Sequence, residues 1–153
     1  MNEPQKTHIF IGADHGGFVY KESLRASIEQ LGYQVTDCGA AVLDPTDDYP
    51  DIAQVVAQQV AAHQESFGIL LCRTGAGMCV AANKIAGIRA VCTTTVETTQ
   101  LAREHNHANV LALGADELTM EQAKELVTVF LQTPASLDQR HVRRIQKIQS
   151  LED

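Results

Sequence analysis

Short apolar runs alternate along the chain with longer stretches that have helical spacing. The runs lie at residues 8–12, 34–37, 68–72, 89–93 and 110–113. Three of them are almost continuously apolar, which is typical of strands buried on both faces of a sheet. Strands that alternate with helices are the signature of a parallel sheet covered by helices. The sequence therefore predicts an α/β fold with a five-stranded parallel sheet.

Helices are expected between the strands, and several of their ends carry capping signals. The expected helices are residues 19–31, 51–63, 77–85, 96–105, 120–132 and 136–150. Gly32 follows the expected helix 19–31 as a C-cap, and threonines precede the expected helix 96–105 as N-caps. Thr119 and Gln122 have the spacing of a capping box, and Pro134 precedes the terminal helix. With neither an internal repeat nor a linker in view, residues 1–153 are predicted to form one domain.

Charge and cysteine content exclude several classes of function. A net charge of −7 argues against a general nucleic-acid or membrane-surface role, although a local basic pocket can still bind an anion. No apolar stretch approaches the ~20 residues of a membrane span, and residues 1–7 are too polar for a signal peptide. The four cysteines show neither CxxC pairing nor zinc-ligand spacing. These features predict a cytoplasmic protein with reduced thiols and no metal site.

The first candidate site residues follow the first strand, because ligands of open parallel sheets bind beyond the carboxyl ends of the strands. Asp14 and His15 lie there within a glycine-bearing turn. They can point functional groups at a ligand, or Asp14 can simply cap the following helix, and the residues alone support both readings equally. The glycine spacing does not match a dinucleotide-binding fingerprint.

A second segment, residues 72–77, follows the third strand and leads into a helix. Its glycine-bearing turn aims backbone N–H groups at any negative charge placed there, which suits a phosphate or an enediolate oxygen. Cys72 would then be a usable base, although a lone cysteine at a strand end is more often a small buried hydrophobe. The adjoining Thr74, Gly75 and Gly77 favour the functional reading.

Two further segments carry polar groups with less specific signals. His105 and Asn106 end a helix, where they can transfer a proton or bind an oxyanion, or merely complete a polar helix terminus. Arg140 and Arg144 share one helix face at i and i+4, where they can grip an anion together or form a solvated face.

Taken together and in order, these segments resemble ribose-5-phosphate isomerase type B, a family that also contains galactose-6-phosphate isomerase subunits and allose-6-phosphate isomerases. The resemblance covers nearly the whole chain, and its strength lies in eight weak motifs in register. They are Gly12-Ala13-Asp14-His15, Asp48-Tyr49-Pro50, Cys72 with Thr74-Gly75-Ala76-Gly77, Ala81-Ala82-Asn83-Lys84, Gly87-Ile88-Arg89-Ala90, His105-Asn106, Asn109-Val110, and Arg140-His141 with Arg144.

The resemblance implies a Rossmann-like three-layer α/β/α sandwich with a C-terminal helix and active sites between subunits. It implies aldose–ketose isomerisation through a cis-enediolate, above all of ribose 5-phosphate to ribulose 5-phosphate, without metal or nucleotide cofactor. Homodimers or homotetramers are expected. By the same resemblance Cys72 moves a proton between C2 and C1, while His105, Thr74 and Asp14 assist ring opening and proton transfer to oxygen. The implied ligands of the substrate are His15, Tyr49, Gly75, Ala76, Gly77, Asn106, Arg140 and Arg144.

Two positions depart from the family pattern. Arg73 stands where the family usually has glycine, and Asp116 stands where it usually has an arginine that helps to hold the phosphate. We expect Arg73 to contact the substrate, either replacing the missing phosphate ligand or reshaping the pocket for another sugar. A four-carbon ketose phosphate, allose 6-phosphate and galactose 6-phosphate therefore stay open as substrates. A non-catalytic sugar-phosphate or nucleotide-binding module is the alternative from another class, and Cys72 argues against it.

Overall fold

The computed structural model describes residues 7–152, in which five strands form a parallel sheet. The strands pair in the order β2-β1-β3-β5-β4, and every pairing is parallel. The predicted five-stranded parallel sheet is confirmed. Residues 1–6 lie outside the described part, so the expected absence of a signal peptide stays a prediction. The strands are β1 (His8–Ala13), β2 (Gln34–Asp37), β3 (Phe67–Cys72), β4 (Ala90–Cys92) and β5 (Val110–Gly114).

Six helices connect and follow the strands, and their capping signals are confirmed where the sequence showed them. Thr119 and Gln122 form a reciprocal capping box, and Gly32, which follows the C-cap residue Leu31 of α1, has a positive φ of 93°. The last helix begins three residues later than expected, because the Asp138 side chain caps it by accepting the Arg140 N–H at 3.0 Å. The helices are α1 (Phe18–Gln30), α2 (Tyr49–Ala62), α3 (Ala76–Ala82), α4 (Val96–Asn106), α5 (Met120–Gln132) and α6 (Gln139–Gln149).

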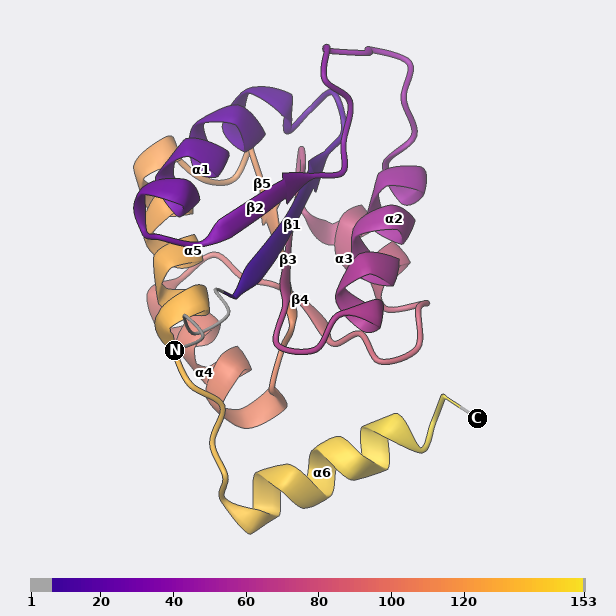
Figure 1. The fold of residues 1–153 in the computed structure, drawn as a ribbon, viewed down its shortest axis with the longest axis vertical. Helices are drawn as coiled ribbons and strands as arrows, with labels where there is room; N and C mark the ends of the chain where they lie inside the picture. The colour runs from indigo at the N-terminus through magenta and orange to yellow at the C-terminus, as the bar shows by residue number, and fades with distance from the viewer. Residues whose placement is uncertain (1–6, 153) are drawn as a thin grey trace, which may run out of the picture.

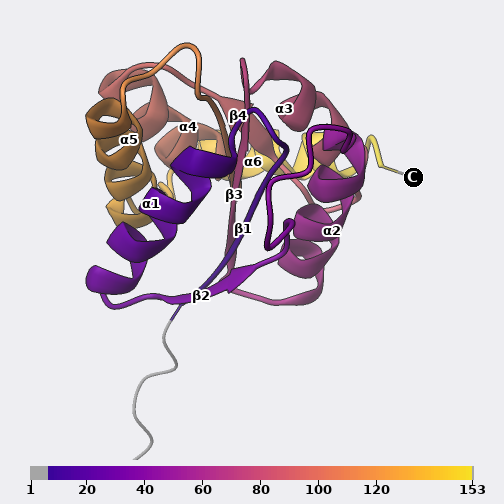
Figure 2. The same cartoon turned by 90° about the horizontal axis from the view of Figure 1, so that it is seen from above.

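Side chains alternate along each strand between two layers of helices. In β3, Ile69 and Leu71 pack in one cluster with α1, α4 and α5, whereas Leu70 and Cys72 pack in the other with α2 and α3. Figure 2 shows the two layers on opposite sides of the sheet. This arrangement confirms the Rossmann-like three-layer sandwich, and it turns Cys72 toward the layer that contains α2 and α3.

The terminal helix α6 lies apart from both layers, along one end of the molecule (Figure 1). It docks mainly through His141 and Ile145, which are buried, while Arg140 and Arg144 are exposed. The imidazole ring of His141 stacks on that of His105 from α4, with 4.2 Å between the ring centroids. Within residues 7–152, no helix combines the length and apolar character needed to cross a membrane.

A buried ion pair joins α1 to the end of β2. The Lys21 side chain is fully buried, and its Nζ lies 2.7 Å from an Asp37 carboxylate oxygen and donates to the Ala40 carbonyl at 2.8 Å. The Phe18 ring covers the same ammonium at 4.8 Å from its centroid. Because a buried ammonium is costly without a partner, this pair holds the segment that leaves β2 and runs toward Tyr49.

We predict that Asp37→Asn destabilises the protein by about 3 kcal/mol, because it leaves a buried ammonium without its counter-charge. The matched change Glu22→Gln removes the other carboxylate near Lys21, which is half exposed and 3.5 Å away, and should cost less than about 1 kcal/mol. Urea unfolding of both variants at one protein concentration measures the difference. Equal losses of stability would show that the Lys21–Asp37 pair contributes no more to stability than the carboxylate of Glu22.

Candidate functional site

A cavity of about 400 Å³ opens at the carboxyl ends of β1 and β3. The sheet order reverses between these two strands, since β2 lies on the far side of β1 while β5 and β4 lie beyond β3. Such a switch point is where open α/β sheets bind ligands. The cavity brings together most of the predicted residues of the first two segments. It is lined by Asp14, His15, Tyr49, Cys72, Arg73, Thr74 and Gly77.

Cys72 ends β3 at the floor of this cavity, with only 6% of its surface exposed. Its Sγ accepts a hydrogen bond from the Gly75 N–H at 3.1 Å. Gly75 has a φ of +79°, and a Cβ there would lie 2.8 Å from the Cys92 Sγ, so the turn requires glycine. The turn therefore presents a backbone N–H group to the sulfur. Ala76, expected among the ligands, begins α3 but does not line the cavity.

Asp14 serves the turn after β1 as well as the cavity. Its Oδ1 accepts hydrogen bonds from the N–H groups of Gly16 at 2.9 Å and Gly17 at 3.2 Å, at the start of α1. The carboxylate is 7% exposed and still lines the cavity. The two readings of Asp14 are thus compatible, since one oxygen organises the turn and the other is not needed for it.

His15 is oriented by Asp47, a residue that the sequence analysis missed. Asp47 Oδ1 accepts both the His15 Nδ1–H at 2.7 Å and the His15 backbone N–H at 3.0 Å. With Nδ1 donating to a carboxylate, the ring can present Nε2 to a ligand. Asp14, His15 and Asp47 have the donor types of a metal site, with ligand atoms within 4.8 Å of one another, but these hydrogen bonds already account for the arrangement.

Arg73 and Asp116 form an ion pair at the rim of the cavity. Their closest charged atoms are 3.5 Å apart, and both side chains are more than half exposed. The Asp116 N–H also donates to the Arg73 carbonyl at 2.9 Å, so the turns after β3 and β5 are joined. The stem of Arg73 covers Gly16, where an added Cβ would lie 2.6 Å from Arg73 Cγ. The two departures from the family pattern are therefore direct neighbours.

Tyr49 forms a wall of the cavity beside the helix that follows the turn after β3. It begins α2, and its ring rests on Gly77, where an added Cβ would lie 2.7 Å from ring carbons. Gly77 thus allows the aromatic wall to approach the helix that follows Cys72. Thr74 completes this side of the cavity and is exposed.

The remaining predicted residues do not reach this cavity within one copy of the chain. His105 and Asn106 end α4, just before the first residue of β5, whereas Cys72 pairs with Gly114 at the last residue of β5. Four residues of strand separate these two ends of the sheet by about 13 Å. Arg140 and Arg144 lie on α6, beside His105 rather than beside Cys72.

Comparisons with known proteins found relatives both by sequence and by structure. A family model described as Ribose/Galactose Isomerase matches residues 9–148. Ribose-5-phosphate isomerase B of Mycolicibacterium paratuberculosis is 42% identical over 90% of this chain and 86% of its own. The Escherichia coli K12 protein of the same name is 40% identical over 94% of this chain and 95% of its own. The crystal structure of ribose-5-phosphate isomerase B from Mycoplasma genitalium, with bound ribulose-5-phosphate, has a TM-score of 0.91 at 38% identity and covers 95% of this chain and 96% of its own.

Proposed function

The chain belongs to the ribose/galactose isomerase family, and on this basis we propose that it interconverts ribose 5-phosphate and ribulose 5-phosphate. It is an aldose–ketose isomerase. We further propose that residues 1–153 act as one cytoplasmic domain. The reaction relocates protons within one sugar and transfers no electrons to an acceptor, so the proposal includes no redox cofactor.

The observation that carries the proposal is the environment of Cys72. A buried sulfur lies at the floor of a cavity beside the turn formed by Thr74 and Gly75, whose N–H already points at it. In the proposed step the Cys72 thiolate removes the proton from C2 of the open-chain aldose, and the electron pair forms an enediolate. A proton moves from O2 to O1 of the enediolate, and the same thiol then returns a proton to C1, which gives the ketose. N–H groups of the turn, Ala76 among them, stabilise the enediolate oxygen.

The other residues that line the cavity are assigned to phosphate binding and to opening of the sugar ring. His15, with its ring fixed by Asp47, offers Nε2 to the phosphate. Asp14 and Thr74 lie close enough to the cavity to exchange protons with sugar oxygens during ring opening, and Tyr49 lines the sugar site. The ion pair of Arg73 with Asp116 is exposed, and such a pair contributes about 0–1 kcal/mol. Arg73 can therefore leave Asp116 for a phosphate at little cost.

We propose that a second copy of the chain completes each site, in a homodimer or homotetramer. One copy supplies the cavity at the carboxyl ends of the strands, and its partner supplies His105, Asn106, Arg140 and Arg144 from the opposite end of the sheet. The supporting observations are that these four residues lie together and that none of them lines the cavity of its own copy. In a two-fold dimer the exchange is reciprocal, so two complete sites form.

The first test is an assay, without added metal, of phosphorylated aldoses and ketoses with four, five and six carbons. We expect the ribose 5-phosphate and ribulose 5-phosphate pair to react fastest. Cys72→Ala should reduce kcat about a thousandfold, because the carbon acid loses its base, while the protein stays folded.

The matched control for this assay is Cys92→Ala, which removes a neighbouring thiol that does not line the cavity. Burial raises the pKa of the Cys92 thiol, so it is poorly suited as a base, and its loss should leave kcat within about twofold. Full activity of Cys72→Ala would refute the assignment of the base. If no sugar is turned over, the result favours a non-catalytic binding module. If a six-carbon or four-carbon sugar phosphate reacts faster than ribose 5-phosphate, the protein is specific for that substrate instead.

Arg73 is tested by two variants that act in opposite directions. Arg73→Gly should raise KM for ribose 5-phosphate about tenfold, because a charge-assisted hydrogen bond to the phosphate is lost. Asp116→Asn releases Arg73 from its partner and should leave KM unchanged or lower it. Steady-state kinetics on the sugar panel measure both effects. If Arg73→Gly alters neither KM nor the ranking of substrates, Arg73 is not a ligand of the substrate.

Shared sites are tested by mixing two inactive variants, Cys72→Ala and His105→Ala. Each homodimer carries one defect in both of its sites, whereas a hybrid dimer has one doubly defective and one intact site. After exchange of subunits at equal concentrations, half of the dimers are hybrids, so about a quarter of the normal activity should return. No recovery, with exchange verified by mass spectrometry, would place both residues in the site of one subunit.

A further inference from the structure

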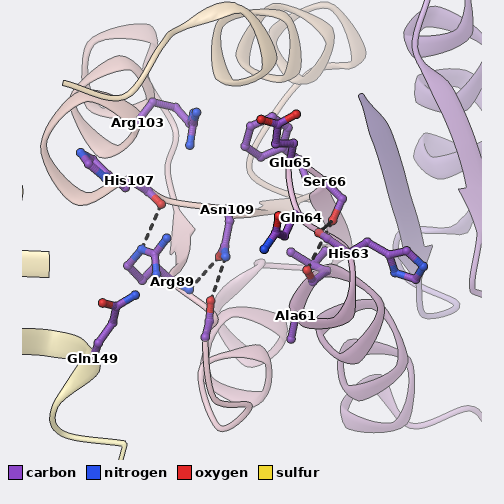
Figure 3. A pocket seen from close by; sticks show the side chains of 13 residues that line it. Ala61, His63, Gln64, Glu65, Ser66, Arg89, Arg103, His107, Asn109 and Gln149 are labelled. Atoms are coloured by element: carbon purple, nitrogen blue, oxygen red, sulfur yellow. Dashed lines mark hydrogen bonds between the residues drawn. The ribbon is translucent and has the colours of Figure 1, made fainter. Parts of the chain in front are cut away.

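A second cavity, of about 340 Å³, lies at the opposite end of the sheet from Cys72. Its walls come from the end of α2, the segments that lead into β3, β4 and β5, and the last turn of α6. Figure 3 shows Arg89, Arg103 and Asn109 around this cavity, with Gln149 entering from α6 next to Arg89. Its size falls at the lower end of the range for small-molecule sites.

Arg103 is a fixed and nearly buried part of this cavity, with 8% of its surface exposed. Its Nε donates to the Thr133 carbonyl at 3.2 Å, and Nη1 donates to the Ala108 carbonyl. The guanidinium also lies over the Phe67 and Phe130 rings. All of these partners are uncharged, and within residues 7–152 no carboxylate forms an ion pair with Arg103. A buried positive charge is thus held in place without being neutralised.

Arg89 adds a second guanidinium, on a side chain that is only partly buried. Its Nε donates to the His107 carbonyl at 3.0 Å, and the described part of the chain contains no ion pair to it. Burial lowers the pKa of both guanidiniums, and the charge of Arg89 further lowers the pKa of Arg103. Two arginines that repel each other in a partly buried cavity are a costly arrangement unless an anion joins them.

The acidic groups near the cavity do not supply that anion. Glu152 raises the pKa of Arg89 from a distance, but its Oε1 accepts the Gly87 N–H at 2.8 Å and does not form an ion pair with Arg89. Glu65 lines the cavity as an exposed side chain and forms no ion pair with either arginine. His63 turns its ring away from the arginines in Figure 3 and donates to the Gln59 carbonyl at 2.7 Å.

We propose that this second cavity binds a phosphate group, either as inorganic phosphate or on a small phosphomonoester. Arg89 and Arg103 supply the positive charge, and the side-chain amides of Gln149 and Gln64 supply further polar groups at the rim. Guanidinium groups match the geometry and charge of phosphate oxygens. Because Gln149 belongs to α6, a phosphate bound here also contacts the helix that carries Arg140 and Arg144. The site is separate from the catalytic cavity, and its existence does not depend on the proposed reaction.

The test follows the side-chain signals of the cavity by ¹H–¹⁵N NMR during a titration with inorganic phosphate at constant ionic strength. The Nε–H groups of Arg89 and Arg103 are hydrogen-bonded to carbonyls, so their signals can be observed as exchange with water slows. We expect saturable shifts of these signals and of the Gln149 amide. A parallel titration with glycerol 2-phosphate distinguishes the two sources, since a site for free phosphate alone will not respond to the ester. Phosphate in the catalytic cavity is followed separately through the Gly75 N–H.

Variants distinguish phosphate binding in this cavity from a general effect of phosphate ions on charged groups of the protein. Arg89→Met should abolish saturation, but it also removes a structural hydrogen bond, so a second variant is needed. Gln149→Glu places a carboxylate at the rim and should weaken phosphate binding about fivefold or more. Gln146→Glu makes the same change one turn earlier on the exposed surface of α6, outside the cavity, and should leave the affinity unchanged. Linear shifts without saturation, or equal effects of the two glutamates, would overturn the proposal whether or not the protein isomerises sugars.

Discussion

The parallel register of β1, β3 and β5 is the constraint on which the cavity beside Cys72 depends. Ala13 pairs with Leu71, and Cys72 pairs with Gly114, so the three strands end at nearly the same level. Backbone hydrogen bonds continue this ladder into the turns, with the Asp14 N–H donating to the Leu71 carbonyl and the Ala115 N–H to the Cys72 carbonyl. The turns that line the cavity are therefore extensions of the sheet and share its rigidity.

Close packing of the turns sets narrow limits on which residues can occupy them. A Cβ at Gly114 would lie 2.7 Å from the Thr74 backbone, and one at Gly17 would lie 2.6 Å from the Leu71 side chain. These contacts bring the turn after β5 against the turn after β3, and the start of α1 against β3. The glycines thus matter mainly through the space they leave, because this space lets the turns that line the cavity pack closely against one another.

Local patterns predicted the elements well, whereas contacts between distant segments could not be predicted. The capping box at Thr119 was evident because its partners are three residues apart, and the start of α6 was misplaced because Asp138 was not recognised as its cap. Asp47 escaped notice because it reaches His15 across 32 residues of sequence, through a loop whose path no spacing specifies. Likewise, nothing local indicates that His105 lies at the end of the sheet opposite Cys72, because that depends on the direction in which α4 returns to β5.

The placement of α6 has a consequence for the order in which the protein forms. The last strand of the sheet ends at Gly114 and the last helix of the two layers at Gln132, so the core is complete before α6 is synthesised. The helix then docks through a ring stack and a single aliphatic side chain, His141 and Ile145, onto a surface that already exists. Neither core cluster contains a residue of α6, so the sheet and its two helix layers can fold without α6, which carries Arg140 and Arg144. Folding of the core and docking of α6 can thereby be separate events.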